Sequence, residues 1–160
     1  MAITLGQRSL ARLNGVHPDL VRVVKRAASI ADPQDDFTVL EGVRSKEQMC
    51  VNYGKGRTAA QCIAKGVPGR YAQPAAAKVT WLSNPYASIH GVQKDGLGHA
   101  VDLAPYPIDW NNLTRFDRVA QLMLRAASLE GVAIRWGGDW DRDGKPREKG
   151  ESDSPHFELV

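Results

Sequence analysis

Several features that define large classes of protein are missing from this sequence. Its 160 residues include only two cysteines, Cys50 and Cys62, too few for a disulfide framework. We expect two free thiols, although the two could also pair. No apolar run approaches the roughly 18 residues of a membrane span. Residues 1–15 carry Arg8 and Arg12 but no continuous apolar stretch, so the sequence predicts no secretory signal peptide and no stable membrane association.

A strong charge of one sign is also missing. The chain has 21 basic and 18 acidic residues, a net charge of +3, which by itself says little about partners. The charges are unevenly distributed, however: residues 53–80 hold five basic and no acidic residues, and residues 139–153 hold six acidic ones. These segments are either two solvated loops or a basic flank beside an acidic, cation-binding segment. No basic helix or aromatic–basic motif indicates a nucleic-acid partner.

The chain also lacks internal repeats, low-complexity tracts and a dividing linker. With 42% hydrophobic and 24% charged residues, it has the composition of a soluble globular protein. We therefore expect residues 1–160 to form a single domain.

Hydrophobic periodicity predicts a mixture of helices and strands. Helices are expected over residues 18–30, from Ser45 to Val51, and from Asn111 or Asn112 to Gly131. Strands are expected over residues 37–40, 79–82, 98–104, 132–136 and 157–160. Residues 53–77 show no clean period and are expected to form a long functional or mobile connection. Because helices and strands mix without regular alternation, the predicted fold class is α+β.

Four histidines are present, and three of them accompany carboxylates. The exception is His17, which precedes Pro18 at a predicted helix start and is expected to cap it. In an extended segment 98–104, His99 and Asp102 face opposite sides, so they cannot easily bind one metal. Asp102 lies among small apolar residues, where a carboxylate needs either a salt-bridge partner or a metal.

The C-terminal segment offers a second histidine–carboxylate combination. Pro155 stiffens the approach to His156, which precedes apolar residues of a predicted strand, while Asp153 stays on the preceding loop. A zinc hydrolase needs two or three nitrogen or oxygen ligands, an open position for water and a nearby carboxylate base. His90, Asp102 and His156 would form such a ligand set.

Several motifs together resemble a known family. They are Ser88-Ile89-His90, Gly98 to Tyr106, Trp136 to Trp140 and Asp153 to Val160, with Phe37 to Arg44 and Gln48 further upstream. In this order they resemble the zinc peptidases of the D-Ala-D-Ala carboxypeptidase (VanY-like) family, and particularly phage endolysins that are L-alanyl-D-glutamate peptidases. The resemblance covers nearly the whole chain.

The resemblance implies a fold, a cofactor and roles for individual residues. The implied fold is α+β, of the hedgehog and D,D-peptidase type, in which helices pack on a small antiparallel sheet that carries the zinc ligands. The implied zinc ligands are His90, Asp102 and His156. Asp153 corresponds to the catalytic carboxylate. Arg44 would hold a substrate carboxylate or the developing oxyanion, assisted by Gln48 one helical turn later.

The spacing of the zinc motif departs from the family pattern, which is Ser-x-His-x-x-Gly-x-Ala-x-Asp. Here His90 lies twelve positions before Asp102, so about five extra residues fall between them. An ungapped alignment would put Asp95 in the ligand position. We prefer His90, because Ser88 precedes it at the family's spacing and nearby glycines would let the insertion bulge outward.

The acidic segment contains Asp139, Asp141 and Asp143 at alternate positions, followed by Gly144. This pattern opens many calcium loops, and some related phage endolysins bind calcium in the corresponding loop. An EF-hand would require Glu at the twelfth position, where this sequence has Gly150. The segment is therefore either a calcium site or an acidic surface turn.

The resemblance implies a phage endolysin that cleaves the L-alanyl-D-glutamate bond of the peptidoglycan stem peptide. The alternatives are a D-Ala-D-Ala carboxypeptidase and a catalytically silent, zinc-containing domain that binds the cell wall. We expect a monomer that is made in the host cytoplasm and acts on the wall, in the periplasm, after release. Candidate cleft walls, each of which could equally be core, are Trp81, Tyr86 and Trp140.

Overall fold

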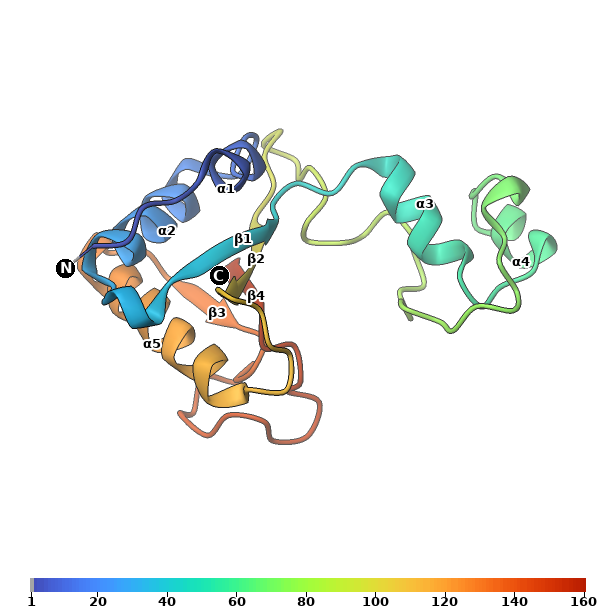
Figure 1. Ribbon diagram of the computed structural model, residues 1–160. Coiled ribbons are helices and arrows are strands. Elements are labelled where there is room, and N and C mark those ends of the chain that lie inside the picture. The colour runs from blue at the N-terminus through green and yellow to red at the C-terminus, as the bar shows by residue number, and fades with distance from the viewer. Residues whose placement is uncertain (1) are drawn as a thin grey trace.

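The computed structural model describes residues 2–160 and has an α+β architecture, as the sequence predicts (Figure 1). The helices are α1 (Gln7–Arg12), α2 (Pro18–Ile30), α3 (Lys46–Gly54), α4 (Ala59–Ala64) and α5 (Leu113–Glu130), with 3-10 turns η1 (Pro33–Asp35) and η2 (Gly69–Tyr71). The strands are β1 (Phe37–Glu41), β2 (Ala100–Pro105), β3 (Ile134–Trp136) and β4 (His156–Leu159). None of the helices within residues 2–160 is long and apolar enough to cross a membrane.

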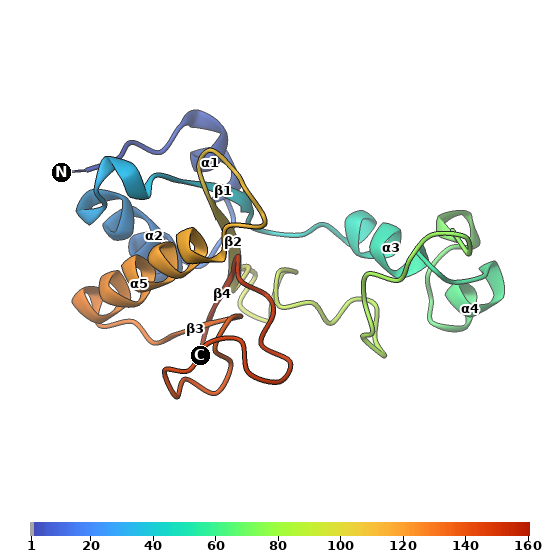
Figure 2. The same cartoon turned by 60° about the horizontal axis from the view of Figure 1, so that its bottom comes forward.

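The four strands form one antiparallel sheet in the order β1-β2-β4-β3. Helices α1, α2 and α5 cover the sheet in both views (Figures 1 and 2). The core between the layers includes the fully buried Leu20, Met123, Val101, Leu103 and Phe157. Burial of these side chains supplies the main driving force for packing the helices on the sheet.

Local capping explains where the two long helices begin and end. The ring of His17 accepts a hydrogen bond from the backbone N–H of Asp19 at 3.1 Å, which confirms its predicted capping role. Asn112 caps α5 through the N–H of Arg115. The same helix ends at Gly131, whose φ of 67° is the left-handed conformation that glycine adopts without strain.

Helices α3 and α4 and turn η2 project from the sheet as a separate lobe, which we call the basic lobe (residues 46–88; Figures 1 and 2). Its small core contains Tyr53, Val67 and the two cysteines, Cys50 and Cys62, which are buried free thiols. Ser45 caps α3 as predicted.

Two expectations for the basic lobe are wrong. Residues 53–77 are not one irregular connection, because Thr58 and Gln61 form a reciprocal capping box that starts α4. Residues 79–82 form no strand. Their apolar side chains, including Trp81 at 76% exposure, do not contribute a face to the sheet.

Candidate metal centre

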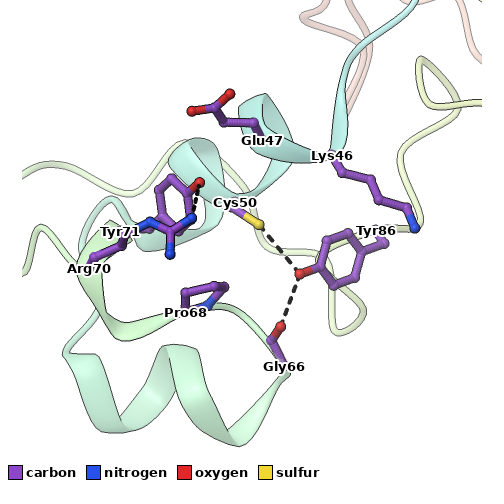
Figure 3. A pocket seen from close by; sticks show the side chains of 8 residues that line it. All are labelled: Lys46, Glu47, Cys50, Gly66, Pro68, Arg70, Tyr71 and Tyr86. Atoms are coloured by element: carbon purple, nitrogen blue, oxygen red, sulfur yellow. Dashed lines mark hydrogen bonds between the residues drawn. The ribbon is translucent and has the colours of Figure 1, made fainter.

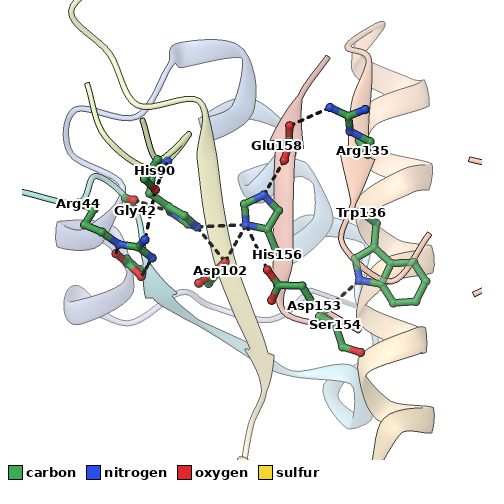
Figure 4. Close-up of polar contacts among 12 residues, drawn as sticks. Gly42, Arg44, His90, Asp102, Arg135, Trp136, Asp153, Ser154, His156 and Glu158 are labelled. Carbon is green, nitrogen blue, oxygen red and sulfur yellow. Dashed lines mark hydrogen bonds and ion pairs between the residues drawn. The ribbon is translucent and has the colours of Figure 1, made fainter. Parts of the chain in front are cut away.

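The sheet brings together side chains that are far apart in the sequence. Asp102 on β2 pairs directly with His156 at the start of β4. His90 lies on the segment that returns from the basic lobe toward β2, and its ring reaches the same point (Figure 4). Asp95, the alternative ligand, is paired instead with His99 at 2.7 Å.

The three side chains converge at hydrogen-bond distances. His90 Nε2 lies 3.1 Å and His156 Nδ1 3.3 Å from the same oxygen, Oδ1 of Asp102. The two ring nitrogens are 3.1 Å apart. Both imidazoles are only 4% exposed, so these atoms meet in a site that is largely closed to bulk water.

The outer ring nitrogens determine which imidazole atoms carry hydrogen. His90 Nδ1 lies 3.0 Å from the carbonyl oxygen of Gly42, which can only accept, so Nδ1 donates and Nε2 presents a lone pair. His156 Nε2 lies 2.8 Å from Oε1 of Glu158, so Nε2 donates, and in the neutral imidazole Nδ1 presents a lone pair. The close approach at Gly42 requires glycine, since a Cβ there would lie 1.9 Å from the carbonyl oxygen of Arg12.

Two lone pairs and a carboxylate oxygen therefore face one another. Oδ1 of Asp102 is buried and has no hydrogen-bond partner among the described residues. Buried acceptors without donors are costly, and a cation between them removes that cost. The residues fit a divalent metal with two nitrogen ligands, one oxygen ligand and an open position.

A second layer of contacts holds His156 in place. Oε2 of the buried Glu158 accepts from the Arg135 guanidinium at 3.1 Å, while Oε1 accepts from His156. Such outer partners set the tautomer and orientation of a ligating histidine. Sequence analysis missed Glu158 and Arg135. The available signal was that Glu158 stands two positions after His156 on a strand, which places both side chains on the same face.

Asp153 lies beside His90, Asp102 and His156 without joining their cluster. Its Oδ2 is 3.9 Å from His156 Nδ1, and its side chain is 53% exposed. Burial, opposed by the neighbouring His156, raises the pKa of the Asp153 carboxyl. The turn that carries it is anchored by the Trp136 indole, which donates to the carbonyl of Ser154 at 2.7 Å. Asp153 is thus accessible, yet held at a defined place.

Arg44 adjoins the metal centre from the end of β1. Its backbone N–H donates to the carbonyl of His90 at 2.8 Å. The guanidinium binds both carboxylate oxygens of Glu41, at 2.6 and 2.8 Å, and donates to Ser88 Oγ at 3.2 Å. The hydrogen bond to Glu41 raises the pKa of Arg44. Gln48, in contrast, is exposed and donates to Asn52 at 2.9 Å rather than to any ligand residue.

The extra residues before Asp102 form a closed hairpin. Val92 and Gly98 form an antiparallel bridge, and Gln93 N–H donates to the carbonyl of Leu97 at 2.9 Å. Asp95 lies at the tip of this hairpin and is exposed. The insertion therefore bulges away and leaves His90 beside Asp102.

The acidic segment folds into a compact loop, which we call the acidic loop (residues 139–151). Asp139 and Asp141 share a cluster with Glu151, and ligand atoms within that cluster lie within 4.8 Å of one another. Glu151 is only 5% exposed and accepts from the backbone N–H groups of Asp141 and Glu148. Asp143 joins a second such cluster with Asp141 and Glu148, and its charge raises the pKa of Glu148. Sequence analysis counted both glutamates in the acidic segment but did not assign them as calcium ligands, because the twelfth EF-hand position falls on Gly150.

A cavity lies in the basic lobe, away from the metal centre. It has a volume of about 800 Å³ and is bounded by α3, by residues 66–71 and by Tyr86 (Figure 3). The Tyr86 hydroxyl donates to the carbonyl of Gly66 at 3.0 Å and contacts Cys50 Sγ at 3.3 Å. Of the three candidate cleft walls, Trp140 is the one beside the metal centre, with its ring 5.4 Å from that of His156.

Comparison with known proteins gives concordant results. The phage L-alanyl-D-glutamate peptidase family matches residues 1–160. The chain is 31% identical over 166 residues to the L-alanyl-D-glutamate peptidase of Escherichia phage T5, with 100% of both chains covered. It also resembles the crystal structure of the Serratia marcescens L-Ala D-Glu endopeptidase ChiX, with a TM-score of 0.57 and 28% identity over 96% of this chain and 87% of that one.

Substitution of His90 and of Asp95 tests which of the two is the third metal ligand. His90→Ala deletes a nitrogen ligand, so the purified protein should lose stoichiometric divalent metal after dialysis. Asp95→Ala removes the partner of His99 and an acceptor for the backbone N–H of Leu97, but no proposed ligand, so this variant should retain the metal. Elemental mass spectrometry measures both. Retention in His90→Ala together with loss in Asp95→Ala would contradict the ligand set.

Glu158→Gln tests the outer contact to His156. The neutral amide holds the imidazole less firmly and leaves the Arg135 charge unpaired, so metal affinity should fall by about 10- to 100-fold. Competition with a chelating dye measures the affinity, and circular dichroism checks the fold. The exposed Glu47→Gln is the matched control. Unchanged affinity in Glu158→Gln would show that Glu158 does not orient the ligand.

Proposed function

The chain belongs to the phage L-alanyl-D-glutamate peptidase family, and we propose from this premise that His90, Asp102 and His156 hold a catalytic zinc ion. The chain is thus a peptidase that acts on peptidoglycan, and the expectation of an L-alanyl-D-glutamate peptidase is confirmed at the level of the family. The observation that carries the proposal is the convergence of two imidazole lone pairs on the partnerless Asp102 oxygen.

Zinc accounts best for this donor set. Two imidazoles, one carboxylate and an open position form a ligand set typical of catalytic zinc in hydrolases. When bound, zinc polarises the scissile carbonyl and lowers the pKa of a water molecule at the site. The chain's own contribution is to aim both imidazoles inward, through hydrogen bonds to Gly42 on one side and Glu158 on the other.

Asp153 is the proposed general base. Its carboxylate accepts a proton from the attacking water and passes it to the leaving amine of glutamate. Three features support this role: its distance of 3.9 Å from the ligand atom of His156, its partial exposure, and a pKa raised by burial. A base that is not itself a ligand also argues against a catalytically silent zinc fold, which would need a fourth protein ligand.

Arg44 is proposed to bind substrate beside the zinc ligands. Glu41 and Ser88 engage three of its five N–H groups, so two remain for a substrate carboxylate or the developing oxyanion. Gln48 is proposed as an assisting residue, which its exposed position on the first turn of α3 permits.

The acidic loop is proposed to bind calcium. Asp139, Asp141 and Asp143 provide carboxylates, and Glu148 and Glu151 bring further oxygens to the same place, as calcium prefers. The loop leads directly to Asp153. Calcium is therefore expected to order the loop and support the position of the base, without taking part in the chemistry.

In this proposal, residues 1–160 form a single zinc peptidase domain that works as a monomer on the peptidoglycan stem peptide. The protein is made in the host cytoplasm and reaches the wall, on the periplasmic side, after release. Cleavage of the wall then serves host lysis.

Asp153→Asn separates the chemistry from metal binding. Asparagine keeps the shape but cannot accept the proton, so kcat should fall by about two orders of magnitude or more while zinc content stays unchanged. Mass spectrometry of products from stem peptides measures the rate. Asp109→Asn, an exposed substitution outside the site, is the control. Near-normal turnover in Asp153→Asn would show that another residue is the general base, and Glu151 would be the next candidate.

Calorimetry in metal-free buffer tests the acidic loop. The zinc-loaded protein should release or absorb heat on titration with calcium, and Asp141→Ala should weaken binding because it removes a carboxylate common to both clusters. Peptidase rates at fixed zinc should rise with calcium in the wild-type protein only. No measurable heat at millimolar calcium would leave this segment as an ordinary acidic loop.

A further inference from the structure

A second cavity adjoins the metal centre, and apart from Arg44 its lining residues have no role in the mechanism above. It has a volume of about 320 Å³ and lies where the basic lobe meets the end of β1. Arg44 and Ser88 line its inner end. Ser88 Oγ accepts from the backbone N–H of His90 at 3.3 Å and from Arg44 at 3.2 Å, so this end of the cavity is in contact with a proposed zinc ligand.

The charged side chains that line this cavity are all cationic. They are Arg44 and Lys55, and no Asp or Glu is among the lining residues. Glu41 offsets the charge of Arg44 through two hydrogen bonds. Lys55 has no such partner: its ammonium makes no ion pair or side-chain hydrogen bond with any residue of the described chain, 2–160. The cavity therefore carries one uncompensated positive charge.

The position of Lys55 is fixed by the backbone. It ends α3, and it forms a parallel bridge with Gln73. The next residue, Gly56, donates its N–H to the carbonyl of Gln73 at 2.8 Å. The side chain is half-buried. The ordered backbone therefore holds Lys55, which has no ion-pair partner among residues 2–160, at the wall of the cavity, where its ammonium can bind an anion.

The substrate supplies an anion on the same side of the scissile bond. A glutamate joined through its nitrogen to alanine has two carboxyl groups and can continue the chain through only one of them. The other remains a carboxylate or is converted into an amide. It lies within a few bonds of the leaving nitrogen, so it comes close to the zinc ligands during catalysis.

We propose that this cavity binds the free carboxylate of D-glutamate between Arg44 and Lys55, and that Lys55 makes the enzyme prefer the carboxylate over the amide. This inference rests on the proposed function. Arg44 alone would distinguish poorly between a carboxylate and an amide, because Glu41 already balances its charge. Lys55 supplies the net charge that a carboxylate satisfies and an amide does not. Asn52, also on the cavity wall, accepts from Gln48 through its oxygen and so keeps its N–H groups as further donors.

Paired peptides test the proposal. The probes are N-acetyl-L-alanyl-D-glutamyl-L-lysine peptides, linked through the γ-carboxyl, with the α-carboxyl either free or as the primary amide. The zinc-loaded wild-type enzyme should cleave the acid with a kcat/KM about tenfold or more above that of the amide, mainly through KM. Lys55→Met should lose this preference, because only cleavage of the acid peptide becomes slower. Lys55→Arg should keep the preference.

The amide peptide is the internal control for folding, since its cleavage by Lys55→Met should match that by the wild type. Lys25→Met, an exposed change on α2, should alter neither rate. Equal cleavage of both peptides by the wild type, or an equal loss on both in Lys55→Met, would overturn the role of Lys55 while leaving the proposed function intact. Failure of the wild type to cleave either peptide at the alanyl–glutamate bond would overturn the proposed function and this inference with it.

Discussion

The pairing of β2 with β4 is the constraint on which the site depends. It places Asp102 directly opposite His156, and a carboxylate and an imidazole so close together in a closed site require a compensating charge. The rest of the arrangement meets this requirement. Gly42 and Glu158 orient the two imidazoles from outside, and the helical layer keeps the sheet rigid. In the proposed zinc centre, the metal ion would complete the electrostatics and would not have to organise the ligands itself.

The charges outside the centre are separated in space as well as in sequence. The basic lobe follows β1, and the acidic loop precedes β4, so the two approach the metal centre from different elements. The lobe contributes cations, Arg44 at its base and Lys55 within the adjoining cavity, where an anionic peptide is expected. The acidic loop leads into Asp153. The basic lobe is therefore suited to the proposed binding of substrate, and the acidic loop is suited to positioning Asp153, the proposed base.

Local rules account for much of the fold. The capping roles of His17, Ser45 and Asn112 depend on neighbours within a few residues, and the apolar periodicity of α2 and α5 defines their buried faces. The predictions of secondary structure are wrong where tertiary contacts determine the conformation of a segment. Residues 79–82 have strand-forming composition but no partner strand, and β-propensity reflects packing against such a partner rather than the backbone alone. Helix α4 was missed because its six residues are too short for a clear period.

By itself, the sequence determined the α+β class, the main helices, the family resemblance and the residue types of the site, because each depends on local pattern or short motifs. Only the tertiary structure decided that His90 rather than Asp95 lies beside Asp102, since the intervening hairpin closes through contacts that no spacing rule contains. It likewise revealed Glu158 and Arg135 behind His156, Glu151 within the acidic loop, and the unpaired Lys55 beside Arg44. The physical reason is that charge compensation and hydrogen bonding act over distances of a few ångströms, which residues remote in the chain reach only after the sheet has formed.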